Sequence, residues 1–111
     1  MGYYTRFDLD VQDSTEEQDK EITKEIYKIF GIEEDFNEES FYGEFFEEEM
    51  KWYDYQKDMK KLSKKFPELL FELSGAGEEQ GDLWYAWFKN GKMQYEKAQV
   101  MFGEFDERKL K

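Results

Sequence analysis

The sequence predicts an α+β protein in which two helices cover one face of a four- or five-stranded, mostly antiparallel sheet. Three patterns favour this two-layer sandwich. Apolar residues alternate in several short segments, two other segments carry them at helical spacing, and Asn90-Gly91 joins two alternating segments as a hairpin. At 111 residues the chain can build one hydrophobic core but not two. We therefore expect a single domain over residues 1–111, with a core at about 3–102 and a flexible C-terminal tail at 103–111.

The first expected elements are a strand and a helix. Residues 3–11 alternate between apolar and polar side chains, which is typical of a half-buried strand. Ser14, with Glu17 three residues later, indicates a capping box at the start of a helix, and Gly31 can end that helix. The apolar stripe of this helix is formed by Ile22, Ile26, Ile29 and Phe30.

A second strand and a second helix are expected in the middle of the chain. Residues 45–53 can form a strand in which Phe46, Met50 and Trp52 share one face. Asp54 can cap a helix that runs to about Phe66, just before Pro67. Its inward residues would be Met59, Leu62 and Phe66, and its outward residues Lys57, Lys60, Lys61, Lys64 and Lys65.

Three further strands complete the expected sheet. Residues 69–74 alternate, and residues 83–89 and 92–102 flank the Asn90-Gly91 turn. Alternation in the first strand of this hairpin separates Leu83, Tyr85 and Trp87 from Trp84, Ala86 and Phe88. One set should face the core, and the other, with its surplus aromatic area, would be an interface or a homodimer seam.

The most unusual feature is an acidic block between Lys28 and Lys51 that contains no basic residue. Its nine carboxylates are Glu33, Glu34, Asp35, Glu38, Glu39, Glu44, Glu47, Glu48 and Glu49. A second acidic loop between Gly75 and Leu83 carries Glu78, Glu79 and Asp82. Aromatic residues are interleaved with the block, whereas acidic solvating tails contain few aromatics. Phe41, Tyr42, Phe45 and Phe46 would supply apolar contact to a partner if they are exposed.

The charge and composition exclude several classes of function. A formal net charge of −12 disfavours direct binding to nucleic acid or to an anionic membrane, since both would repel the chain. The absence of cysteine and histidine removes disulfides, most zinc sites and the usual catalytic triads. Neither acidic segment has the spacing of a calcium loop or of a phosphate-binding loop. We therefore expect no enzyme activity, no metal and no cofactor.

The expected cellular compartment follows from two features that the sequence lacks. The sequence contains no run of about twenty apolar residues, and residues 1–11 lack the basic and apolar regions of a signal peptide. We expect a cytoplasmic protein, in the host cell if the chain is encoded by a phage.

The segment KWYDYQKDMKKLSKKFPELLFELSGAGEEQGDLWYAWFKNGK resembles part of small phage- and plasmid-encoded proteins of unknown function that contain a ferredoxin-like domain. The resemblance covers residues 51–92 by sequence and about 3–102 by the order of elements. It implies a ferredoxin-like fold and an origin in a phage or other mobile element, where short acidic proteins often inhibit host defence. It carries no functional signature that transfers residue by residue.

Two hypotheses for function follow. In the first, the chain is a phage-type inhibitor, such as an anti-CRISPR, whose twelve acids mimic DNA or RNA and block the basic surface of a host nucleic-acid-handling protein. Carboxylates at alternate strand positions, such as Glu47 and Glu49 or Asp8 and Asp10, would stand roughly 6.8 Å apart, comparable with successive phosphates. In the second, the acids only keep the protein soluble, and the exposed aromatics form a homodimer or a larger assembly.

Overall fold

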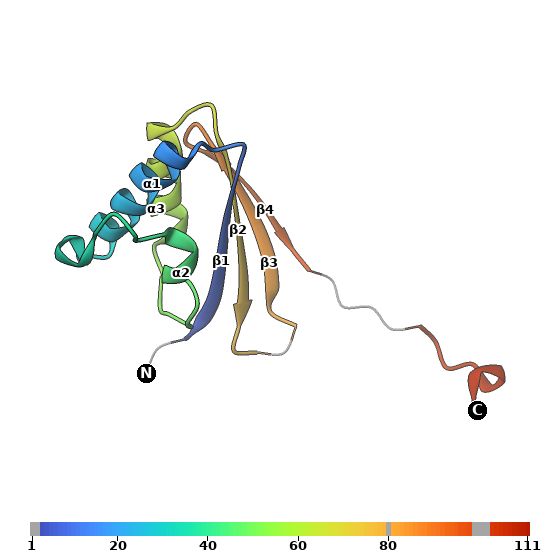
Figure 1. Ribbon diagram of the computed structural model, residues 1–111. Helices are drawn as coiled ribbons and strands as arrows, with labels where there is room; N and C mark the ends of the chain where they lie inside the picture. Colours follow the sequence, from blue (N-terminus) through green and yellow to red (C-terminus); the bar gives the residue numbers. More distant parts are fainter. Residues whose placement is uncertain (1–2, 80, 99–102) are drawn as a thin grey trace.

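The structure, a computed structural model, describes residues 3–79, 81–98 and 103–111. Four strands form one sheet in the order β1-β2-β3-β4, and every neighbouring pair is antiparallel. The elements follow as β1 Thr5–Gln12, α1 Glu16–Ile29, the 3-10 turn η1 Glu33–Asp35, α2 Tyr42–Phe45, α3 Tyr55–Lys65, β2 Leu70–Gly77, β3 Leu83–Lys89, β4 Lys92–Lys97 and η2 Glu107–Lys109. Figure 1 shows α1, α2 and α3 together on one side of the sheet. The α+β prediction with an antiparallel sheet is confirmed.

The ferredoxin-like prediction is wrong. A ferredoxin-like chain returns to a helix after its central hairpin, whereas here α1, α2 and α3 all lie between β1 and β2 and the remaining strands follow as a meander. The expected strand at residues 45–53 is also absent, apart from a single bridge between Met50 and Thr5. Phe45 and Phe46 both pack towards the core, which a strand with alternating faces does not allow.

The local signals for the other elements are largely confirmed. Helix α1 begins with a capping box, although Thr15 and Gln18 make it rather than Ser14 and Glu17. Asn90 and Gly91 have φ of 49° and 79°, as the tight turn between β3 and β4 requires. Strand β4 is described only to Lys97, and residues 99–102 of the predicted strand lie outside the described residues.

The core lies between the helices and one face of the sheet. Its sheet side is built from Phe7, Leu9, Val11, Phe71, Leu73, Trp84, Ala86 and Phe88, and its helix side includes Ile22, Ile26, Met59, Leu62 and Phe66. The five predicted outward lysines of α3 are exposed, which confirms how that helix is oriented. No helix in the described part of the chain is long and apolar enough to cross a membrane.

Candidate protein-binding surfaces

The acidic segment, residues 33–49, is held against the body of the protein by its own aromatic residues. Tyr42 and Phe46 are buried, and Phe45 packs against Phe30 with ring centroids 4.8 Å apart. Phe46 stacks on Trp52 at 5.8 Å, and Trp52 meets Phe7 of β1 at 5.3 Å. This chain of contacts fixes α2 to α1 and to the sheet, so the carboxylates between the aromatics have a defined support.

This packing changes the expected role of four aromatic residues. Phe41 is 42% exposed, but Tyr42 and Phe46 belong to the core and Phe45 is half-buried. Their spacing explains the difference, since positions 42, 45 and 46 follow the i, i+3, i+4 pattern of a helix face. Phe41 is therefore the residue of this group that can offer a large apolar surface to a partner.

A buried hydrogen bond fastens α2 to α1. The Thr23 hydroxyl donates to the Asp19 carbonyl oxygen at 2.8 Å and accepts a bond from the Tyr42 backbone N–H at 3.0 Å. Thr23 is fully buried, so the Tyr42 N–H would have no water in reach without this partner. The position of the acidic segment therefore depends on one threonine of α1.

Replacing Thr23 with valine should lower the free energy of unfolding by about 1–3 kcal/mol, because the change keeps the shape of the side chain but leaves a buried N–H unsatisfied. Chemical denaturation measures this loss, and hydrogen exchange at the Tyr42 amide should speed up. Thr5→Val is the control, since Thr5 is only partly buried and lies in a strand. Equal stabilities of the two variants would contradict the anchoring role of Thr23.

Alkaline pH offers a second test of the packing of α2. Burial raises the pKa of Tyr42 from its ordinary 10.0 to about 12, with Asp19 and Asp10 adding to the shift. Between these values the folded protein holds a proton that the unfolded chain has lost, so the free energy of unfolding should fall as the pH rises from 10 to 12. The loss should reach about 2–3 kcal/mol. Denaturation of the wild type and Tyr42→Phe across this range measures it, and parallel curves for the two proteins would contradict it.

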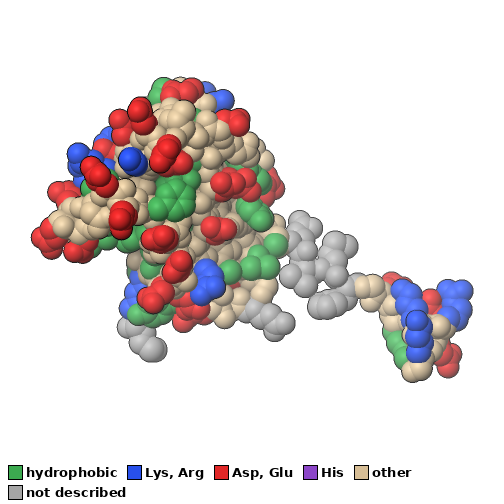
Figure 2. Space-filling model, in the orientation of Figure 1, with side chains coloured by type: hydrophobic (Ala, Val, Ile, Leu, Met, Phe, Trp, Pro, Cys, Tyr) green, Lys and Arg blue, Asp and Glu red, His purple; other side chains and the backbone are tan. Residues whose placement is uncertain are grey.

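All nine carboxylates of the acidic segment are exposed. The ion pairs found among the described residues are Lys28–Glu25, Lys65–Glu25 and Arg108–Asp106, so no described lysine or arginine neutralises the segment. Figure 2 shows acidic side chains on the surface over η1 and α2. The predicted strand row of Glu47 and Glu49 is absent, because residues 46–48 form a turn and a bend and Glu49 lies in no strand.

The second acidic loop lies near the last part of the acidic segment. Thr5 bridges Met50 on one side and pairs with Gly77 on the other, so Glu49 and Glu78, which adjoin Met50 and Gly77 along the chain, both lie near the start of β1. Glu78 and Glu79 are exposed, whereas Asp82 is partly buried and accepts a hydrogen bond from the Tyr3 hydroxyl. This bond raises the pKa of Tyr3. Asp82 thus holds the loop in place, and its neighbours extend the acidic surface.

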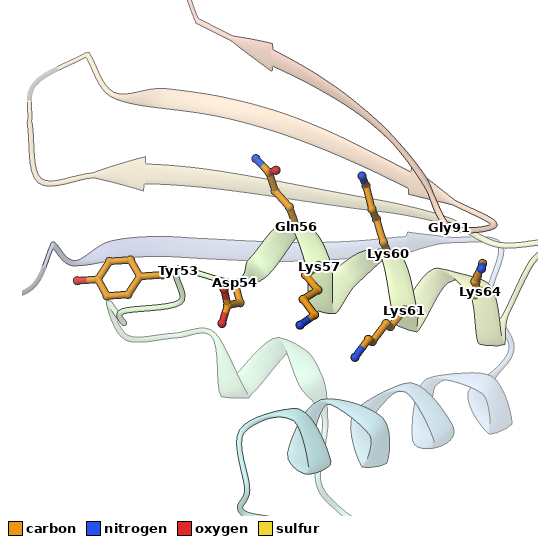
Figure 3. A pocket seen from close by; sticks show the side chains of 8 residues that line it. All are labelled: Tyr53, Asp54, Gln56, Lys57, Lys60, Lys61, Lys64 and Gly91. Atoms are coloured by element: carbon orange, nitrogen blue, oxygen red, sulfur yellow. The ribbon is translucent and has the colours of Figure 1, made fainter.

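Four of the five outward lysines of α3 border a groove of about 580 Å³, namely Lys57, Lys60, Lys61 and Lys64. In Figure 3, Gln56 and Lys60 point to one side of the helix and Lys57 and Lys61 to the other. None of these three lysines is paired with a carboxylate among the described residues. The side chains diverge instead of converging on one point, as expected of a solvated helix face.

The outer face of the sheet, opposite the helices, is a third surface and one that the sequence left undecided. Trp84, Ala86 and Phe88 are buried, so the other set of β3 residues points outward: Leu83 is 49% exposed, Tyr85 is 50% exposed and Trp87 is partly buried. No described helix covers this face (Figure 1). Alternation alone did not decide which of the two sets faces the core. The structure places Trp84, Ala86 and Phe88 in the core and the other set at the surface.

Neither a metal centre nor a known relative identifies the activity. Within residues 3–79, 81–98 and 103–111, no three carboxylates are grouped so that they could hold a metal ion. Searches against protein-family models, curated proteins and solved structures found no match to this chain. The resemblance to phage and plasmid proteins therefore stays a prediction.

Proposed function

We propose that this protein is a non-enzymatic inhibitor that binds a basic host protein and blocks the surface on which that protein holds DNA or RNA. The observation that supports the proposal best is the state of the acidic segment: nine exposed carboxylates without a described ion-pair partner, on a support fixed by buried aromatics. The resemblance to phage-encoded proteins favours a nucleic-acid-handling defence system, such as a CRISPR nuclease, as the target.

The fixed support matters for affinity. A flexible acidic tail would lose conformational freedom on binding, whereas residues 42–46 are already ordered by contacts with α1 and Trp52. Exposed carboxylates without an ion-pair partner among the described residues, on a chain with net charge −12, also speed encounter with a basic surface. Binding should therefore weaken as the salt concentration rises.

The proposal is tested by capturing partners from bacterial lysate on the immobilised protein, eluting with a salt gradient and identifying them by mass spectrometry. We expect one nucleic-acid enzyme that is released at moderate salt and displaced by added DNA or RNA. A partner that nucleic acid does not displace would contradict occlusion of a nucleic-acid site. Enrichment of the protein itself alone would contradict the inhibitor function.

A self-associating structural protein is the second candidate, and the open outer face of the sheet is the observation that favours it. The exposed Leu83 and Tyr85 could be covered by another copy, and β4 pairs on one side only within the described sheet. Size-exclusion chromatography with light scattering separates the two functions. A dimer that persists at high salt would favour self-association, and a monomer would favour the inhibitor.

A further inference from the structure

The register of the sheet places aromatic and acidic side chains together on its outer face. One row across the sheet consists of Asp8, Ser74, Tyr85 and Glu96, and the next consists of Asp10, Glu72, Trp87 and Gln94. Directly opposed residues on one face have Cβ atoms about 4.5–5.5 Å apart. Each aromatic residue in the centre therefore has a carboxylate as its immediate cross-strand neighbour.

The two aromatic rings form a stacked pair, the Tyr85–Trp87 platform. Tyr85 and Trp87 stack with ring centroids 5.8 Å apart and an interplanar angle of 16°. Beside Tyr85, the lining of a groove of about 420 Å³ includes Arg6, Asp8, Leu83, Tyr85, Glu96 and Lys97. Half of the Tyr85 surface remains exposed, although burying such a ring would normally stabilise a folded protein. The platform is thus available to a ligand.

The charges define what this ligand must be. Asp8, Asp10, Glu72 and Glu96 occupy the two central rows, while the basic residues lie towards the ends of the strands, with Arg6 and Lys97 at one end and Lys89 and Lys92 at the other. Aromatic faces attract cations, and carboxylates accept hydrogen bonds from them. A guanidinium group satisfies both conditions, because it is planar, stacks on rings and binds a carboxylate with two parallel hydrogen bonds.

We propose that the outer face of the sheet binds an arginine-bearing, extended segment of the partner protein, with one guanidinium on the Tyr85–Trp87 platform and held by Glu72 or Glu96. Aliphatic side chains of the same segment would lie in the groove beside Leu83. The inference rests on the proposed function for the existence of a basic partner. The site itself follows from the sheet register and does not involve residues 33–49.

Charge argues against the other occupants of this face. A second copy of the chain would bring its own Asp8, Asp10, Glu72 and Glu96 against the same residues, which like-charge repulsion disfavours. Nucleic acid would meet the same four carboxylates and be repelled. A purely apolar segment would bury these carboxylates without a partner, at a large cost in desolvation.

The test uses a capped hexapeptide of alternating arginine and leucine, titrated into the ¹⁵N-labelled full chain. We expect saturable chemical-shift changes at the amides of residues 72–76 and 83–88. A matched peptide with citrulline in place of arginine has nearly the same shape but no charge, and it should bind at least about tenfold more weakly. Saturable shifts confined to residues 33–49, or no saturable shifts, would overturn the proposal.

Matched protein variants locate the site. Tyr85→Leu keeps an apolar side chain but removes the ring, and Glu72→Gln with Glu96→Gln removes two charges at constant shape; each should weaken peptide binding about tenfold. The control, Glu47→Gln with Glu48→Gln and Glu49→Gln, should bind as the wild type does. Equal binding of the arginine and citrulline peptides would mean that the groove recognises apolar side chains and not the guanidinium charge. Dimerisation through this face would mean that its occupant is a second copy of the chain. Either result would overturn the proposal.

The peptide test and the lysate capture fail independently. Peptide binding at β3 without capture of a nucleic-acid enzyme would leave the arginine site standing and remove the proposed inhibitor function. If the protein captures such an enzyme but does not bind the peptide, the inhibitor function stands and the arginine site is excluded.

Discussion

Reversing Glu47, Glu48 and Glu49 to lysine should abolish partner binding and leave the protein folded. These three side chains are exposed and take part in no ion pair with a described residue, so the fold does not depend on their charge. The reversal replaces attraction by repulsion near the start of β1, where the acidic segment ends and the second acidic loop begins. We expect the affinity for the captured partner to fall at least about 100-fold, equivalent to about 2.7 kcal/mol.

The control for this experiment carries the same change in net charge at other sites. Glu21→Lys, Glu68→Lys and Glu107→Lys alter three exposed carboxylates outside the acidic segment, and this variant should lose much less affinity. Circular dichroism and denaturation verify that both variants fold. If the two triple variants lost affinity equally, net charge would explain binding and the acidic segment would have no special role. Unchanged affinity in the first variant would exclude the segment as the contact surface.

Local signals were sufficient for most elements of this fold. The Asn90-Gly91 turn, the lysine face of α3 and the alternation in β1 each depend on residues near one another in sequence, and the structure has all three. The topology was not predictable in this way. It depends on whether residues 45–53 pair with the sheet, and there the alternation of Phe46, Met50 and Trp52 suggested a strand.

In the candidate surfaces, too, some features follow from local sequence and others depend on contacts between distant residues. Exposure of the carboxylates follows from their charge alone. The role of Tyr42, Phe45 and Phe46 does not, because it depends on contacts with Thr23, Phe30 and other residues distant in sequence. Aromatics between acids suggested apolar contacts for a partner, and most of them instead fix the acids to the core.

The orientation of β3 was also undetermined by alternation, and a glycine on the neighbouring strand explains it. Gly75 pairs with Trp84, and a Cβ atom at position 75 would lie only 2.2 Å from the indole carbons Cε2 and Cζ2. The missing side chain makes room for the largest residue of the core face. Tyr85 and Trp87 are thereby directed outward, which creates the platform of the proposed arginine site.

Gly75→Ala should therefore destabilise the protein more than its single added methyl group suggests. Trp84 cannot move aside easily, because Tyr55 stacks on it at 4.7 Å and Phe7 and Tyr95 meet it at 5.9 and 5.8 Å. We expect a loss of about 3 kcal/mol or more in the free energy of unfolding, measured by chemical denaturation. Gly103→Ala is the control, since no atom of the described residues outside its chain neighbours lies within 4 Å of its added Cβ, and it should change stability by no more than about 0.5 kcal/mol.

A double-mutant cycle with Trp84→Leu shows whether the indole ring is the cause. Trp84→Leu alone should be destabilising, because it leaves a cavity among aromatic residues. In that background the methyl group of Gly75→Ala has space, so its additional cost should fall below about 1 kcal/mol. An unchanged cost of Gly75→Ala in the Trp84→Leu protein would mean that backbone freedom, and not the contact with Trp84, requires glycine at position 75. The orientation of β3, and with it the platform on the outer face, would then need another explanation.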